Sequence, residues 1–179
     1  MKGRSLEYPL PDERGLVRFR PSVVAHLWRH RQSRLWRSES GGQLFATVSD
    51  QLVEIVEATG PRRSDCRSLF CYVPDREAER VEIRERFAEG LHFVGDWHSH
   101  RQRHPLPSTT DVESMVDMVR RSDHSLAGFL LVIVGTTKFP AGLHVSFHTE
   151  HNFQNLTPAL DATSYDQTGP HPARRARMS

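Results

Sequence analysis

Two histidines and an aspartate lie close together in this 179-residue sequence, at a spacing suited to one metal ion. His98 and His100 are one residue apart, and in an extended strand such residues project from the same face. Asp111 stands at the start of a stretch with helical periodicity, so a turn of the chain after His100 can bring its carboxylate back to the two imidazoles. Two imidazoles and one carboxylate leave the fourth position of a tetrahedral zinc ion to water, which is typical of catalytic sites. The three side chains therefore predict one catalytic zinc ion.

Hydrolysis at such a site also needs a base for the water proton and a donor to the developing oxyanion. Zinc lowers the pKa of its water toward ~7 and polarises a carbonyl, which allows attack on an amide at neutral pH. Ser108, three residues before Asp111, is a candidate donor, although a residue there could equally serve a turn or the start of a helix. Spacing alone does not identify the base, because a carboxylate from any distant segment could fold over the metal.

Other polar residues near the histidines have less specific interpretations. His104 is followed by Pro105, which argues against a continuous helix carrying His100 and His104, so we expect a substrate-facing loop histidine. Asp96 and His92 share the strand face of His98, where they could orient its ring or simply be solvated. Trp97 on the opposite face is expected in the core.

Two further groups of residues are candidates for chemistry or binding. Cys66 and Cys71 match neither a zinc knuckle nor a disulfide framework, and we expect buried, reduced thiols, with a redox-sensitive pair as the alternative. A cluster of arginines is expected to form a solvated face, with partner binding as the alternative: Arg29, Arg31, Arg34 and Arg37.

Hydrophobic periodicity predicts interleaved strands and helices in one domain. The expected strands are 16–19, a hairpin of 43–48 and 52–58, 68–73, 91–100, 126–134 and 143–147. The expected helices run from Ser22 for about three turns, over 75–90, and over 110–121, where Thr110 and Glu113 would form a capping box. We expect an N-terminal extension (1–15), one domain (16–150) and a flexible, polar tail (151–179).

Composition excludes several classes of function. The formal net charge of +2 comes from 24 basic and 22 acidic side chains, too balanced for a strong field toward nucleic acid or an anionic membrane, apart from Arg174, Arg175 and Arg177 near the end. No apolar signal core follows the first residues, and no run reaches the roughly 20 apolar residues that span a bilayer. We therefore expect a cytoplasmic protein with neither nucleic acid nor membrane as a partner.

The order H-x-H, seven residues, S-x-x-D resembles the signature of the JAMM (MPN-plus) metalloproteases over roughly residues 16–150. In that family an upstream glutamate, commonly followed by a glycine pair and an apolar run, is the general base, and Glu39 with Gly41 and Gly42 is similar to that element. The resemblance implies that Glu39 is the base and Ser108 the oxyanion donor, and that the zinc ligands are His98, His100 and Asp111. It also implies an α/β (α+β) MPN/JAB fold of the cytidine-deaminase-like type, with a curved mixed sheet flanked by helices. Arg101 departs from the pattern, because a proline usually follows the second histidine.

Members of this family cut the bond after the C-terminal tail of ubiquitin or a ubiquitin-like protein. The chain looks most like the short single-domain bacterial versions in anti-phage operons of the CBASS or ubiquitin-like conjugation type. The resemblance thus implies a tail or a conjugated target protein as substrate, with an E1/E2-like ligase and a nucleotidyltransferase of the same operon as further partners. Two alternatives stay open: a peptidase that processes a sulfur-carrier protein or a small amide, and a zinc-free MPN scaffold. DNA-repair-associated relatives usually carry Asn where this chain has Ser99.

Overall fold

A mixed eight-stranded sheet dominates the computed structural model, which describes residues 4–34, 36–69, 71–122 and 126–159. In spatial order its strands are β1 (Leu6–Pro9), β2 (Leu16–Phe19), β4 (Leu52–Ala58), β3 (Gly41–Ser49), β7 (His92–Ser99), β8 (Phe129–Val134), β9 (Leu143–His148) and β10 (Phe153–Asn155). The β2–β4 and β7–β8 pairs are parallel and the other pairs are antiparallel. A separate small hairpin contains β5 (Cys66–Arg67) and β6 (Tyr72–Val73).

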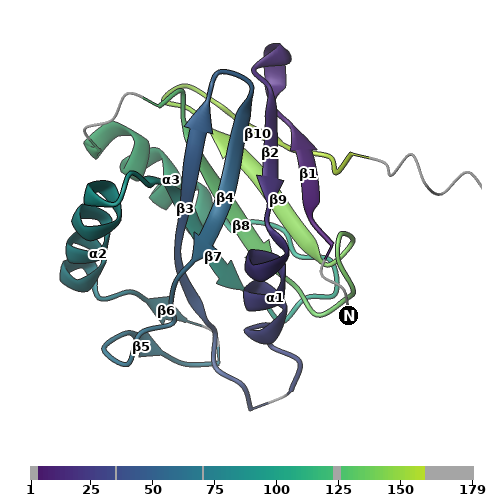
Figure 1. Cartoon of the computed structure of the whole chain (residues 1–179). Coiled ribbons are helices and arrows are strands. Elements are labelled where there is room, and N and C mark those ends of the chain that lie inside the picture. Colours follow the sequence, from purple (N-terminus) through teal and green to yellow (C-terminus); the bar gives the residue numbers. More distant parts are fainter. Residues whose placement is uncertain (1–3, 35, 70, 123–125, 160–179) are drawn as a thin grey trace, which may run out of the picture.

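Helices cover both faces of the curved sheet (Figure 1). One face carries α1 (Pro21–Arg29), whose Val23 and Leu27 are buried in the larger apolar cluster. On the other side lie α2 (Arg76–Ala88) and α3 (Thr109–Arg121), and Met115 and Val119 of α3 are buried in a second cluster. A single 3-10 turn (Pro11–Glu13) joins β1 to β2. The expected α/β class, a curved mixed sheet flanked by helices, is confirmed.

The central strand β8 explains why both clusters can form. All six of its residues are buried, because each of its two faces packs into one of the two apolar clusters. Leu130, Val132 and Val134 belong to the cluster beneath α1, whereas Phe129, Leu131 and Ile133 alternate into the cluster beneath α3.

Among the described residues, none of the helices combines the length and the apolar composition that a membrane-spanning segment needs.

A β-bulge in β7 sets which residues face α3. The register with β3 shifts at Val94, since Leu44 pairs with Gly95 but Phe45 pairs with Phe93. As a result Phe93 packs in the cluster under α3, while Val94 and Trp97 both belong to the α1 cluster. Gly95 has φ +141 and lies so close to the backbone of β8 that a Cβ would overlap the Leu130 carbonyl. Trp97 is fully buried, as predicted.

Several expectations about elements are wrong. A continuous strand over 68–73 is not formed, because the amide of Ser68 donates to the carbonyl of Cys71 (2.8 Å) and the chain reverses between β5 and β6. Both cysteines in this hairpin are exposed free thiols rather than buried ones. The capping box of α3 is formed by Ser108 and Asp111, not by Thr110 and Glu113.

The sheet also extends beyond the expected 16–150 limits. Strand β1 pairs with β2, and β10 pairs with β9, although residues 1–15 and 151–179 were expected to be an extension and a flexible tail. Beyond β10, the amide of Ala159 donates to the carbonyl of Glu7 in β1 (2.8 Å) and brings the two edges of the sheet together. Residues 160–179 of the expected tail, with the three arginines near the end, lie outside the described residues.

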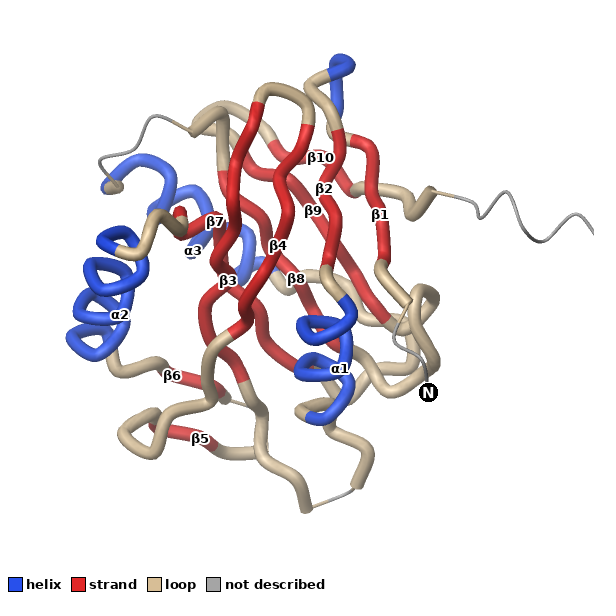
Figure 2. The backbone as a smooth tube through the Cα atoms, viewed as in Figure 1, coloured by secondary structure: helices blue, strands red, loops and turns tan. Residues whose placement is uncertain are grey.

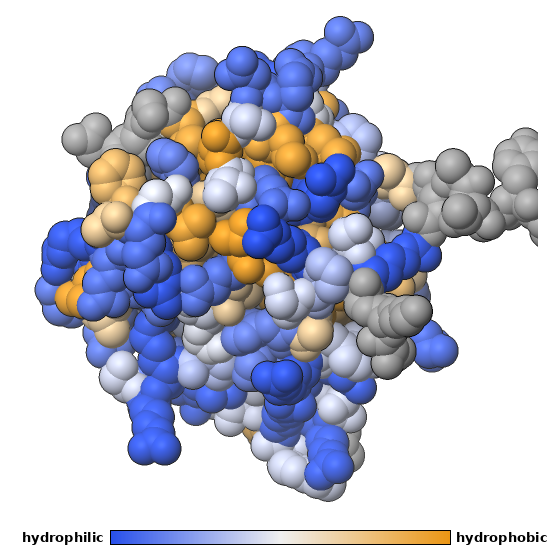
Figure 3. Space-filling view, viewed as in Figure 1, coloured by the Kyte–Doolittle hydropathy of each residue, from blue (hydrophilic) through white to orange (hydrophobic). Residues whose placement is uncertain are grey.

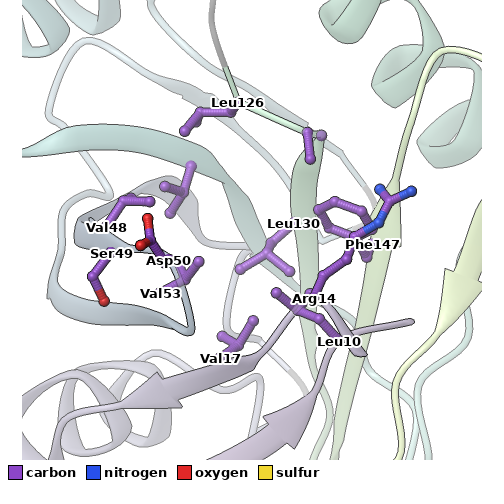
Figure 4. A pocket seen from close by; sticks show the side chains of 13 residues that line it. Leu10, Arg14, Val17, Val48, Ser49, Asp50, Val53, Leu126, Leu130 and Phe147 are labelled. Carbon is purple, nitrogen blue, oxygen red and sulfur yellow. The ribbon is translucent and has the colours of Figure 1, made fainter. Parts of the chain in front are cut away.

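An apolar hollow of about 320 Å³ lies at the end of the sheet where β3 and β4 join (Figure 4). Its walls come from β2, the β3–β4 hairpin, β8 and β9, through side chains such as Val17, Val53, Leu130 and Phe147. The two charged side chains at its wall are Arg14 and Asp50. The histidines lie at the opposite end, because His98 pairs with Gly41 at the beginning of β3. The hollow is therefore separate from the metal-ligand candidates.

Candidate metal centre and active-site cleft

The end of β7 and the first turn of α3 bring the three predicted metal ligands together. His98 lies in β7, His100 just beyond it, and Asp111 is the third residue of α3. The Nε2 atoms of His98 and His100 are 3.0 Å apart, and they lie 3.1 and 3.6 Å from Asp111 Oδ1 and Oδ2. Within the described part of the chain, this is the group of metal-binding side chains whose ligand atoms all lie within 4.8 Å of one another.

These separations fit a tetrahedral zinc site. Ligand atoms about 2.0–2.2 Å from a tetrahedral ion lie roughly 3.3–3.6 Å from each other. The three observed distances, 3.0 to 3.6 Å, are close to that range without any movement of the backbone. The side chains are 15–17% exposed, so one side of the group is open to solvent. The residues present can therefore hold one ion and leave a coordination position accessible.

Ser108 ties the carboxylate of Asp111 to the beginning of α3. Its Oγ accepts a hydrogen bond from the Asp111 amide (3.2 Å), and the Ser108 amide and hydroxyl both donate to Asp111 Oδ2 (2.7 Å each). Burial raises the pKa of the Asp111 carboxyl, but His98 and the two Ser108 donors outweigh burial and hold it well below its usual range. Asp111 is therefore a pre-formed anion, and Ser108 has the helix-start position that was one of its two expected roles.

Glu39 reaches the same cleft from the segment that leads into β3. Gly41 pairs with His98, so Glu39 lies two residues beyond the end of that pairing. Burial raises the pKa of Glu39, the charge of His98 lowers it and the charge of Asp111 raises it, with a net upward shift. A carboxylate with a raised pKa beside a metal-ligand group is suited to accept a proton.

The backbone at Glu39 is held by residues from two other segments. Arg67 of β5 donates from Nε to the Glu39 carbonyl (2.6 Å) and from Nη2 to Ser40 Oγ (2.7 Å). Ser99, between the two histidines, accepts a hydrogen bond at Oγ from the Ser40 amide (3.0 Å). Gly41 allows the ring of Tyr72 to pack directly against the backbone, because a Cβ there would overlap the ring. Sequence reasoning missed Arg67, Ser99 and Tyr72, which carry no local signal of their role.

The cleft around these groups has a volume of about 390 Å³. Its walls come from the segment before β3, the β5–β6 hairpin, the first turn of α2, β7 and α3. Asp96 lines it beside Arg76, whose Nη1 is 3.9 Å from Asp96 Oδ2, and burial together with the charge of Glu79 raises the pKa of Asp96 to about 7. Asp96 shares the face of His98, as expected, whereas His92 packs against Phe87 of α2.

His104 lies apart from the metal-ligand candidates. It is exposed in the loop between His100 and Ser108, and its Nδ1 is 3.0 Å from the carbonyl of Ala141. A different histidine, His144 of β9, comes into the electrostatic field of the group. Burial lowers its pKa, and the nearby Asp111 carboxylate opposes that effect.

The model of prokaryotic homologs of the JAB domain matches residues 20–148, a range that contains all five predicted site residues. A protein of Vibrio cholerae serotype O1 named "CD-NTase/cGAS isopeptidase" is 32% identical over 124 residues, which are 67% of this chain and 76% of that protein. A protein of the same name from Enterobacter hormaechei is 30% identical over 107 residues, 59% of this chain, and the match spans only 58% of its length. The solution structure of DSY2949 from Desulfitobacterium hafniense has a similar fold, with a TM-score of 0.54 at 14% identity over 76% of this chain and 87% of that one. The chain belongs to the family of prokaryotic homologs of the JAB domain.

Proposed function

We propose that the protein is a zinc-dependent isopeptidase that cuts the bond after the C-terminal tail of a ubiquitin-like protein and so reverses an E1/E2-like conjugation. The observation that carries the proposal is the meeting of His98, His100 and Asp111 in the cleft that also contains Glu39. Relatives named "CD-NTase/cGAS isopeptidase" support an isopeptidase reaction and a conjugated nucleotidyltransferase as a candidate target. The domain expected over 16–150 would carry this activity in an anti-phage system.

The side chains of the cleft divide the work of amide hydrolysis. His98, His100 and Asp111 would hold one zinc ion, which supplies a Lewis acid and a water of lowered pKa. Glu39 accepts the proton of the attacking water and delivers it to the departing amine, a role helped by its raised pKa. Ser108 would turn its hydroxyl hydrogen from Asp111 Oδ2 to the developing oxyanion, while the hydrogen bond from the Ser108 amide to Asp111 Oδ2 keeps the residue in position.

The test is cleavage of a ubiquitin-like tail fused to a reporter by the wild type and by Glu39→Gln. We expect kcat to fall at least ~100-fold in Glu39→Gln, because general base catalysis is removed. Zinc content, measured by elemental analysis, should stay at one ion per chain, because Glu39 is not a ligand in this proposal. Glu113→Gln, on the exposed surface of α3, is the matched control and should behave as the wild type. Full hydrolysis by a zinc-loaded Glu39→Gln protein would contradict the mechanism.

A further inference from the structure

Several connecting segments at the histidine-bearing end of the sheet contain basic residues and no carboxylate, whereas Asp65 and Asp75 lie in two others. Four segments share this composition: 29–38, 66–71, 101–107 and 135–142. Their eight cations, here called the basic collar, are Arg29, Arg31, Arg34, Arg37, Arg67, Arg101, Arg103 and Lys138. The remainder of the chain has 16 basic and 22 acidic side chains, so the four segments carry all of the excess positive charge of the sequence.

Contacts join the first segment to the second and, through the fourth, to the third. Gln32 Nε2 donates to the carbonyl of Leu69 (3.1 Å), which links the first segment to the second. The second segment holds the backbone at Glu39 through Arg67, and the third runs directly between His100 and Ser108.

Two further contacts join the third and fourth segments to the first. The amide of Thr136 donates to the carbonyl of Gln102 (2.8 Å), which joins the fourth segment to the third. Phe139 then packs against Trp28 at the end of α1 (ring centroids 5.3 Å apart), which returns the chain of contacts to the first segment. The four segments of the basic collar therefore lie together at the end of β7 that carries the histidines.

The charges of the collar are not neutralised by the protein itself. Among the described residues, none of the eight cations has a carboxylate oxygen within 4.0 Å, whereas Arg18 of β2, Arg86 of α2 and Arg62 of the segment between β4 and β5 do. Burial lowers the pKa of His30, and the charges of Arg37, Arg29 and Arg67 lower it further, so these three cations lie close together. Positive charge concentrated at one end creates a long-range field toward an acidic partner.

Exposed apolar groups within the collar favour a protein as that partner. Trp36 is 73% exposed with the Arg34 guanidinium 5.8 Å from its ring centre, and Leu106 is 64% exposed. The guanidinium of Arg31 stacks 3.5 Å above Trp28. Tryptophan and arginine are the residue types that most often anchor protein–protein interfaces. In the space-filling view, the lower end of the molecule is mainly hydrophilic, while apolar residues gather over the upper half (Figure 3). The loops below β3 and β7 lie at this lower end (Figure 2).

We infer that the basic collar docks an acidic protein surface, which presents its tail or conjugated lysine to the cleft. The inference rests on the proposed function for what is cut, but the docking itself needs no catalysis. Electrostatic attraction of this kind raises association rates by about 10- to 1,000-fold at low ionic strength. Partner selection then depends on the charge of the folded part of the substrate as well as on the tail.

The test uses one tail sequence fused to two carrier domains of the same fold, one with an acidic and one with a basic surface. At 20 mM salt we expect the wild type to prefer the acidic fusion in kcat/KM by about 10-fold or more. The preference should fade at 0.5 M salt as the Debye length falls. Arg34→Glu with Arg37→Glu should abolish it and leave cleavage of the free tail peptide unchanged. Arg84→Glu, an exposed α2 arginine, is the matched control.

Binding of tail-free carriers separates this inference from the proposed function. If the tail-free acidic carrier binds the wild type more tightly than the basic one, and the double variant loses that difference, the collar is confirmed even where no fusion is cleaved. If the two fusions are cleaved equally well at 20 mM salt, the docking role of the basic collar is wrong, whereas the proposed isopeptidase activity still stands. Duplex DNA that binds more tightly than the acidic carrier at 0.15 M salt, with the same dependence on Arg34 and Arg37, also overturns it.

Discussion

The Nε atom of Arg67 donates a hydrogen bond to the backbone carbonyl of Glu39 (2.6 Å), although the two residues are 28 positions apart in the sequence. The same guanidinium reaches Ser40 Oγ, so two hydrogen bonds fix the segment that carries the proposed base. Tyr72, which pairs with Arg67 in the small hairpin, packs on the next residue but one, Gly41. The β5–β6 hairpin thus acts as a clamp on one wall of the cleft.

Arg67→Ala should lower activity without removing zinc. A misplacement of about 1 Å at a reacting group can cost about 100-fold in rate, and the loss of both Arg67 hydrogen bonds frees the Glu39 backbone. We expect kcat to fall by about 10- to 100-fold while zinc content and the tail peptide KM stay near wild-type values. Arg63→Ala, at an exposed neighbouring position, is the control. Unchanged kcat in Arg67→Ala would show that the clamp has no role in catalysis.

Zinc should stabilise the fold measurably through the His98, His100 and Asp111 group. A ligand that binds only the native state adds about 4 kcal/mol when its concentration is about 1,000 times the Kd. Addition of zinc to chelator-treated protein should therefore raise Tm in calorimetry, and the rise should disappear in His100→Ala. A Tm rise of the same size in His100→Ala would place the ion elsewhere. Glu39→Gln should keep the full effect, because it removes no proposed ligand.

Local patterns predicted most of the large elements. The β3–β4 hairpin, β7, β9, α1 and α3 have an apolar pattern that can be read within one window of the sequence, and β8 is a continuous apolar run. The α2 segment is only partly periodic and was predicted from its many charged residues and the glycine that follows it. The short strands could not be predicted in this way. All three residues of β10 are exposed, so its pairing with β9 depends on a neighbour rather than on its own composition.

The residues of the site also differ in whether local sequence patterns could predict them. His98, His100 and Asp111 could be grouped from spacing because strand and helix geometry connect them locally, and the structure brings them together. Glu39 came only from the family resemblance, since the strand pairing that places it joins Gly41 to a residue far along the chain, His98. Ser99 and Arg67 have no signature in the sequence. The catalytic and ligand roles of all five predicted residues stay predictions, which the substitutions at Glu39, Ser108 and His100 test.

Ser108 has two roles that substitution can separate. Glycine is nearly as good as serine at the start of a helix, within a few tenths of a kcal/mol, but it has no hydroxyl to donate. The free energy of unfolding of Ser108→Gly should therefore lie within ~0.5 kcal/mol of the wild-type value. Its kcat should fall by about 100- to 1,000-fold, because the oxyanion donor is lost. Ser108→Thr keeps both functions and is the control. The proposed donor role fails if Ser108→Gly hydrolyses a tail fusion at the rate of the threonine variant.

The stability of the protein should decrease on mild acidification, with His148 as one cause. This residue of β9 is 1% exposed, stacks on Phe153 of β10 and pairs with Ser146 Oγ at 2.9 Å. Burial, with a smaller contribution from the charge of His144, lowers the pKa of His148 to about 4. Between its ordinary pKa of about 6.5 and about 4, the unfolded chain binds a proton that the folded chain excludes. The contribution of His148 to the free energy of unfolding should thus be fully present above pH 6.5 and should be lost as the pH falls toward 4.

Replacement of His148 by phenylalanine isolates this contribution, because the aromatic ring keeps the stack on Phe153 and cannot titrate. Urea unfolding at pH 7.5 and pH 5, with chelator present so that zinc release adds nothing, gives the loss of stability for each protein. The loss should be smaller in His148→Phe than in the wild type, and a remainder should persist because His26 and His144 also have lowered pKa values. An identical loss in the two proteins would mean that His148 titrates alike in the folded and unfolded chains, and β9 would then be open to water at that position.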